Sequence, residues 1–121
     1  MIGTHIFIWF LKGNEQLKPK TKAILEDAHN AKFLSMASLW EMAIKISIGK
    51  LHLSKPLESF LPIEIPLFPI QKEHIFKIKS LQFHHKDPFD RLIIAQAIVE
   101  NLTIVTDDRQ FKNYDVALIE N

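Results

Sequence analysis

The chain of 121 residues contains no cysteine, and its formal net charge is only +1. Without cysteine, disulfide bonds and thiolate metal sites are both excluded, and the composition fits a reducing cytoplasm. The balanced charge produces no overall field that would attract nucleic acid, so any contact with RNA or DNA must be local. Composition therefore directs attention to individual side chains.

Long apolar runs are also missing. The stretch IFIWFL at residues 6–11 is too short to span a bilayer, and it lacks the basic segment and cleavage site of a signal peptide. We therefore expect no membrane segment and a cytoplasmic location. Hydrophobic residues make up 47% of the chain and charged residues 24%, as in globular proteins. This length suits one domain, covering residues 1–121, with a single core.

Short apolar strands alternate with helices along the chain. This alternation predicts an α/β fold, a three-layer sandwich in which helices cover both faces of a central parallel sheet. In such sheets, ligands bind beyond the carboxyl ends of the strands. The predicted strands are 32–36, 102–106 and 116–119, with an irregular edge strand at 63–70. The predicted helices are 4–12, 19–29, 38–48, 72–80 and 87–101, with short helical turns at 56–61 and 108–113.

The segment HHKDPFDRLIIAQAI at residues 84–98 places two carboxylates, Asp87 and Asp90, at the start of a long helix. Helix capping explains both of them. Asp87 before Pro88 is typical of an N-cap, and Asp90 falls where a carboxylate can reach back to the cap amide. Metal binding is the alternative, and this segment alone does not decide between the two.

Two further acids follow predicted strands. Glu41 lies in SLWEMAIK and Asp108 in TDDRQF, each near a helix start. Ser38 and Glu41 have the spacing of a capping box, and Glu41 and Lys45 that of a helical ion pair. Helix starts that follow parallel strands share one edge of the sheet, so these carboxylates should gather there and repel one another. A divalent cation such as Mg²⁺ would relieve that repulsion.

Arginines and histidines near these acids give weaker signals. The chain has only two arginines, Arg91 and Arg109, and each directly follows a candidate metal ligand. Their guanidinium groups could contact a phosphodiester, with pairing to neighbouring acids as the alternative. His84 and His85 precede the long helix, and we expect a structural loop role for them, with a substrate contact as the alternative.

Four segments together resemble a PIN domain of the VapC toxin type: THIFIWFLKG, ASLWEMAIKISIGKL, HHKDPFDRLIIAQAI and LTIVTDDRQF. They have the order and spacing of that family from Thr4 to the C-terminus. The resemblance implies a ribonuclease that depends on Mg²⁺ or Mn²⁺ and is paired with a cognate antitoxin. It implies that Glu41, Asp90 and Asp108 are catalytic metal ligands, with Asp87 assisting them.

Gly3 departs from the family pattern. The family's first strand usually leads into an aspartate followed by Thr-His, whereas this chain reads MIGTH, with a first strand shortened to Met1 and Ile2. A site with fewer anionic ligands binds Mg²⁺ more weakly, so we expect weakened or absent activity. The alternative is a catalytically silent PIN-fold protein that binds an antitoxin or RNA. The expected substrate contacts are Thr4, Arg91, Thr106 and Arg109.

Apolar side chains at residues 4–11 and 47–63 exceed what one small core readily uses. This surplus predicts a homodimer contact and a groove for an antitoxin helix or strand. We expect Trp9 and Trp40 in the core, with an interface role as the alternative.

Overall fold

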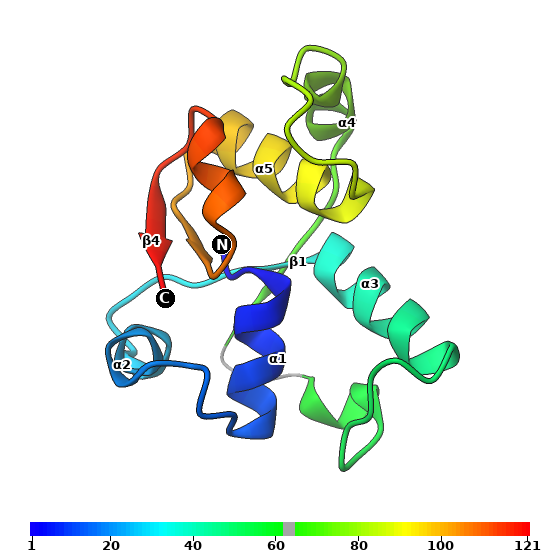
Figure 1. Ribbon diagram of the computed structural model, residues 1–121, viewed down its shortest axis with the longest axis vertical. Coiled ribbons are helices and arrows are strands. Elements are labelled where there is room, and N and C mark those ends of the chain that lie inside the picture. Colours follow the sequence, from blue (N-terminus) through cyan, green and yellow to red (C-terminus); the bar gives the residue numbers. More distant parts are fainter. Residues whose placement is uncertain (62–64) are drawn as a thin grey trace.

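A computed structural model describes residues 1–61 and 65–121 of the chain. Its centre is a parallel sheet in the order β2, β1, Ile2, β3, β4. Figure 1 shows β4 on one side of α1 and α3 on the other. β1 (Leu34–Ser35) pairs with β2 (Leu67–Phe68), and β3 (Ile104–Thr106) pairs with β4 (Leu118–Glu120). Ile2 forms a parallel bridge to β1 on one side and to β3 on the other. This single residue therefore joins the two pairs of strands, in agreement with the shortened first strand that the sequence predicts.

The sheet has a separate apolar core on each face. Ile2 and Val105 belong to the core shared with α1, whereas Met1 and Ile104 belong to the core under α5, because neighbouring strand residues point to opposite faces. The predicted α/β sandwich with a parallel sheet is confirmed. Its helices are α1 (Thr4–Lys12), α2 (Pro19–Glu26), α3 (Met36–Ser47), α4 (Lys72–Ile78) and α5 (Pro88–Glu100), with short 3-10 helices η1 (Leu57–Phe60) and η2 (Arg109–Asn113).

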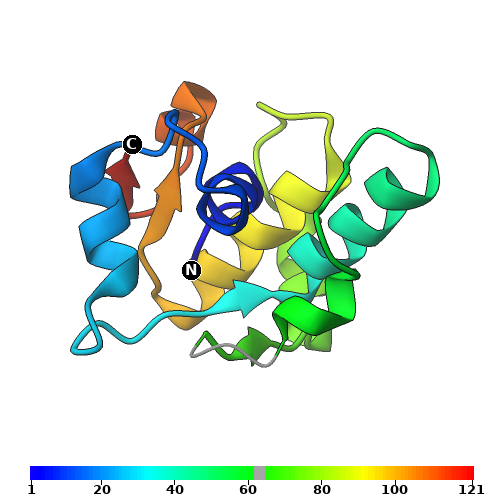
Figure 2. The same cartoon turned by 90° about the horizontal axis from the view of Figure 1, so that it is seen from below.

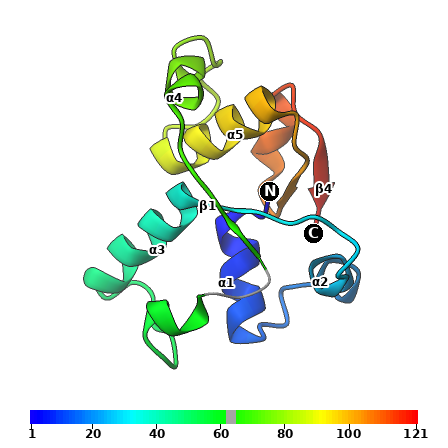
Figure 3. The same ribbon diagram turned by 180° about the vertical axis from the view of Figure 1, so that it is seen from behind.

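The arrangement of the helices brings distant segments together at one edge. Figure 2 shows α1 end-on, between β3 and the helices α3 and α5. Figure 3, seen from behind, shows β1 crossing in front of the start of α1, from α2 to the start of α3. The starts of α1 and α3 and the end of β3 therefore lie close together. None of the described helices combines the length and apolar character needed to cross a membrane.

Several element ends differ from their predicted positions for local reasons. α2 ends at Glu26 because the Asp27 carboxylate accepts a hydrogen bond from the His29 amide at 2.9 Å, a turn that competes with the helix. α3 begins two residues early because Ser35 caps it. The predicted edge strand at 63–70 is reduced to β2, and residues 62–64 lie outside the described part.

Trp40 was expected in the core, and this prediction is wrong. Its side chain is 56% exposed and packs edge-on against Phe89, with ring centroids 4.9 Å apart. A hydrophobic pattern along α3 does not reveal which side of the helix meets the sheet, because apolar residues lie on both sides of it.

Candidate functional site

A cavity of about 120 Å³ lies at the edge of the sheet where Ile2 and β3 end. That volume leaves room for several water molecules or a hydrated ion, because one water takes up roughly 30 Å³. The structure thus brings together acids from three separate parts of the chain. The acidic residues that line the cavity are Glu41 of α3, Asp87 and Asp90 at the start of α5, and Asp107 and Asp108 after β3.

Glu41 lies inside α3 and takes no part in capping it. The cap is Ser35, and the hydroxyl of Ser38 lies 2.9 Å from that of Thr4. The predicted capping box of Ser38 with Glu41 is therefore wrong. The predicted ion pair is confirmed, since the ammonium of Lys45 lies 3.0 Å from the buried Glu41 carboxylate.

Asp87 and Asp90 have different roles at the start of α5. The Asp87 carboxylate accepts hydrogen bonds from the amides of Phe89 at 2.8 Å and Asp90 at 3.0 Å, so it is the predicted N-cap. Asp90 makes no side-chain hydrogen bond within residues 1–61 and 65–121. Burial, together with the charges of Asp87 and Glu41, raises the pKa of Asp90 to about 6. Its position therefore disfavours negative charge unless a cation is near.

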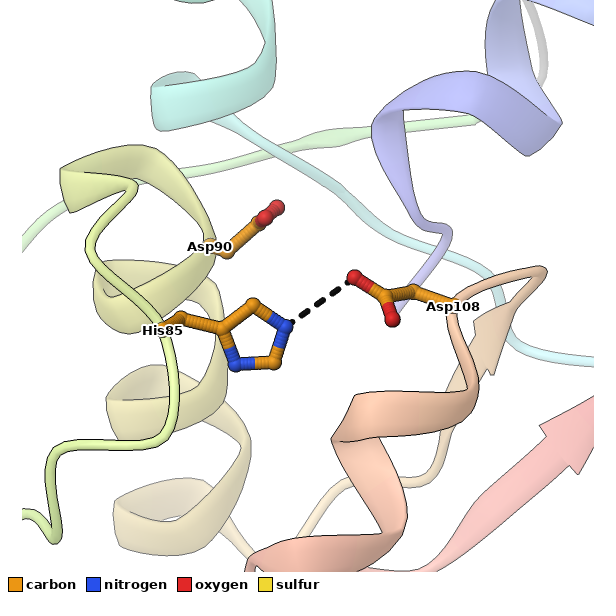
Figure 4. Close-up of side chains that lie close together, drawn as sticks. All are labelled: His85, Asp90 and Asp108. Atoms are coloured by element: carbon orange, nitrogen blue, oxygen red, sulfur yellow. Dashed lines mark hydrogen bonds and ion pairs between the residues drawn. The ribbon is translucent and has the colours of Figure 1, made fainter.

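Asp108 is held from two sides. Its Oδ1 accepts a hydrogen bond from the Gln110 amide at 2.9 Å, and its Oδ2 lies 3.0 Å from Nε2 of His85. Its own amide donates to the Thr106 hydroxyl at 3.0 Å. His85, Asp90 and Asp108 each present a potential ligand atom, and these three atoms lie within 4.8 Å of one another (Figure 4).

The donor atoms of this cluster fit a divalent cation. Carboxylate oxygens are ligands that suit both Mg²⁺ and Mn²⁺. The pKa of Asp90 is raised first by burial and then by the neighbouring carboxylates, and a bound cation would offset both effects. The structure therefore contains a possible acidic metal site.

Comparison with known proteins identifies the family. The PIN domain family matches residues 1–117. The chain belongs to the PIN domain family. The fold resembles a chain in the crystal structure of VapBC2 from Rickettsia felis bound to a DNA fragment from their promoter. The TM-score is 0.74 at 22% sequence identity, and the match covers 100% of this chain and 97% of that chain.

A second relative is similar over a shorter stretch. Ribonuclease VapC16 of Mycobacterium tuberculosis is 44% identical over 43 residues, which are 36% of this chain and 30% of that protein. The match thus spans under a third of the length of that relative. With the family match and the VapBC2 neighbour, it confirms the resemblance to VapC-type PIN domains that the sequence motifs indicate.

Gly3 lines the cavity of this PIN domain, next to the acids. Its amide donates a hydrogen bond to the Val105 carbonyl at 2.8 Å. A Cβ atom added to Gly3 would lie only 2.7 Å from that same oxygen. Any side chain at this position therefore requires the first strand and β3 to shift relative to each other.

The predicted substrate contacts occupy different environments. Thr4 and Thr106 line the cavity, whereas Arg109 is exposed at the start of η2. Arg91 is buried outside the cavity lining, and its guanidinium donates to the carbonyls of Gln82 at 3.0 Å and Leu81 at 3.3 Å. Arg91 thus holds the chain between α4 and α5, and we omit it from the proposed substrate contacts.

His85 is the site residue that sequence reasoning undervalued. A loop role was expected, yet its ring is buried and faces Asp108. Its place two residues before the Asp87 cap was the available signal. No pattern in the sequence indicates that this loop folds over Tyr114, which brings the ring against Asp108.

Asp107, next to Asp108 in the cavity lining, pairs with a histidine of α1. His5 Nδ1 lies 3.3 Å from the Asp107 carboxylate. This hydrogen bond lowers the pKa of Asp107 and raises the pKa of His5. The pair forms part of the cavity lining.

Proposed function

We propose that this PIN domain is a metal-dependent ribonuclease toxin of a toxin–antitoxin pair, weakened by Gly3. Glu41, Asp90 and Asp108 would hold Mg²⁺ or Mn²⁺, with Asp87 assisting. One observation carries the proposal. Glu41 and Asp90 come from different helices, cap neither of them, and still meet at one cavity. Helix capping, the competing explanation, accounts only for Asp87 and Asp108.

The remaining lining residues suit a phosphodiester substrate. A bound divalent cation would activate water and stabilise charge on the phosphoryl oxygens. Lys45 and His5 add basic groups to the lining, and the hydroxyls of Thr4 and Thr106 add hydrogen-bond donors. Arg109, exposed at the start of η2, could contact the nucleic acid further along the strand.

A silent interaction protein is the second candidate, and the packing around Gly3 favours it. The contact between Gly3 and the Val105 carbonyl leaves no room for a Cβ atom, so this backbone suits glycine and not aspartate. Losing one acidic ligand should cost at least the ~10–100-fold that is typical when a supporting residue is lost. The chain would then keep the fold and bind an antitoxin or RNA without cutting.

The proposed protein partners are a cognate antitoxin and a second copy of the chain. The apolar residues at 4–11 were expected to supply this surface, but Ile6, Phe7 and Ile8 are buried in the core. Exposed apolar side chains lie instead along α3 and at its end, and they include Trp40, Ile44 and Ile48.

RNA cleavage with purified protein tests the proposed function. In Mn²⁺ we expect slow cleavage of single-stranded RNA that stops when a chelator is added. Asp90→Asn and Asp108→Asn should abolish it, and Asn preserves the cap at Asp108. Glu58→Gln in η1, an exposed acid far from the cavity, is the matched control. Equal cleavage by all four proteins would reveal a contaminant. No cleavage and no Mn²⁺ binding would favour the silent protein.

A further inference from the structure

The ring of His85 is fixed by aromatic packing on two sides. It stacks on Tyr114 with centroids 5.4 Å apart and meets Phe111 edge-on at 5.1 Å. Both of its nitrogens have polar partners: Nδ1 lies 3.1 Å from the Tyr114 hydroxyl, and Nε2 lies 3.0 Å from Asp108 Oδ2. Aromatic packing and hydrogen bonds together therefore hold the ring in one orientation.

The partners of the ring also determine which nitrogen carries the proton. A carboxylate only accepts hydrogen bonds, so Nε2 must donate to Asp108. In the neutral imidazole, Nδ1 then accepts from the Tyr114 hydroxyl. That hydroxyl in turn accepts from the His84 amide at 3.1 Å. The hydrogen bonds thus run in one direction, from the His84 backbone through Tyr114 and His85 to Asp108.

We propose that His85 is the positioning residue for Asp108 and that Tyr114 sets the orientation of His85. The inference rests on the proposed role of Asp108 as a metal ligand. The Gln110 amide already holds Oδ1 of this carboxylate, so the bond from His85 holds the second oxygen. Both oxygens keep a further lone pair for a cation. Residues that orient a ligand in this way typically change metal affinity by ~10–100-fold when lost.

Nitrogen NMR of His85 tests the hydrogen-bonded chain directly. In metal-free protein we expect a protonated Nε2 and an unprotonated Nδ1. Tyr114→Phe keeps the ring that stacks on His85 and removes only the hydroxyl, so the Nδ1 signal should move while the fold is retained. On addition of Mg²⁺, Nε2 should keep its proton. A protonated Nδ1 in the metal-free protein, or loss of the Nε2 proton with Mg²⁺, would overturn the proposal, the latter by making His85 a ligand.

Mn²⁺ titration calorimetry measures the consequence for the site. His85→Leu removes the donor and should weaken binding by ~10–100-fold. His85→Gln retains an N–H near the place of Nε2 and should recover most of the affinity. His52→Leu, an exposed histidine away from the cavity, is the control. Equal losses in the Gln and Leu variants would contradict positioning by hydrogen bonding.

The two experiments also separate this proposal from the proposed ribonuclease function. The nitrogen signals require neither activity nor bound metal, so they decide the hydrogen-bonded chain even in an inactive protein. The absence of RNA cleavage together with the expected nitrogen signals would refute the nuclease and leave the hydrogen-bonded chain intact.

Discussion

At the scale of single residues, Asp90 shows most clearly how the site lowers the free energy of unfolding. Burial and the neighbouring carboxylates raise its pKa to about 6, whereas an aspartate in an unfolded chain titrates near ~3.9. Between these two pH values the folded protein binds more protons than the unfolded chain, so the free energy of unfolding falls as pH rises. The stability that comes from protonated Asp90 is fully present below about pH 4, and it is lost as pH rises through about 6.

The first prediction concerns Asp90→Asn in protein treated with a chelator. At pH 7.5 the variant should melt at a higher temperature than the wild type, because it removes a charge that the site disfavours. The gain should be only about 1 kcal/mol, because solvent screens a partly exposed group. It should shrink as pH falls toward 4. Thermal unfolding at several pH values measures both effects, with Glu58→Gln as the control. A variant less stable than the wild type at pH 7.5 would contradict it.

The second prediction compares two substitutions at Gly3. Gly3→Ala and Gly3→Asp introduce the same Cβ atom, 2.7 Å from the Val105 carbonyl. Both should therefore lower the free energy of unfolding in chelator, by about 1–3 kcal/mol as in other overpacked sites. When Mn²⁺ is added, only the Asp variant should regain stability. It should also bind Mn²⁺ more tightly than the wild type does. Urea unfolding and calorimetry make the comparison.

The difference between the two Gly3 variants isolates the carboxylate from the steric effect. If Gly3→Asp bound Mn²⁺ no better than Gly3→Ala, the missing acid would not be what limits the site. Vigorous RNA cleavage by the unmodified chain would show that the first-strand carboxylate is dispensable.

The sequence identified the acids of the site more readily than their surroundings. Glu41, Asp90 and Asp108 follow short motifs, and a parallel sheet brings such positions to one edge. His85 could not be assigned in this way, because its role depends on the ring of Tyr114, 29 residues away in the chain. The lack of space at Gly3 is equally invisible in the sequence, because it depends on how closely β3 approaches.

At the scale of elements, the periodic patterns found the helices and strands but missed several of their ends. Some ends depend on one polar contact, such as the Ser35 cap that starts α3 before Ser38. The sheet order was harder to predict, because within residues 1–61 and 65–121 β1 and β3 are joined only through the bridges of Ile2. A two-residue strand offers too little pattern to predict such pairing.

The third prediction concerns the segment between α4 and α5, which carries His85. Arg91 fixes it with hydrogen bonds to the Gln82 and Leu81 carbonyls, and its guanidinium lies 4.6 Å from the Phe83 ring centroid. Arg91→Lys loses the planar group that makes these contacts together. It should lower the free energy of unfolding by about 1–2 kcal/mol.

Urea unfolding of Arg91→Lys measures this cost, and Arg109→Lys is the matched control. The Arg109 side chain is exposed and makes no hydrogen bond or ion pair with any other part of the described chain, so its substitution should leave stability unchanged. Equal stability of the two variants would show that the Arg91 contacts contribute nothing. Hydrogen exchange at residues 79–86 should be faster in the Arg91 variant alone.

At the scale of the whole molecule, the fold separates the acidic cavity from an apolar surface. The cavity lies where Ile2 and β3 end, whereas Trp40, Ile44 and Ile48 lie exposed along α3 and at its end. α3 contributes to both, since Glu41 points into the cavity from the same helix. A partner that covers α3 would therefore lie next to the site, which is the arrangement that an inhibitory antitoxin needs.

The last prediction is that the chain self-associates through α3. Trp40, Ile44 and Ile48 are spaced four residues apart, so they form one apolar strip along the helix. At tens of micromolar, light scattering should give a mass above that of one chain, and the double variant Ile44→Lys, Ile48→Lys should return it to the monomer.

Phe76→Lys on α4, where the side chain is 57% exposed, is the matched control and should leave the mass unchanged. Because the lysines replace exposed side chains, far-ultraviolet circular dichroism should be the same for all three proteins. A strictly monomeric wild type would contradict the homodimer and leave the antitoxin as the proposed partner of the strip. A mass that falls only in the Phe76 variant would move the contact to α4.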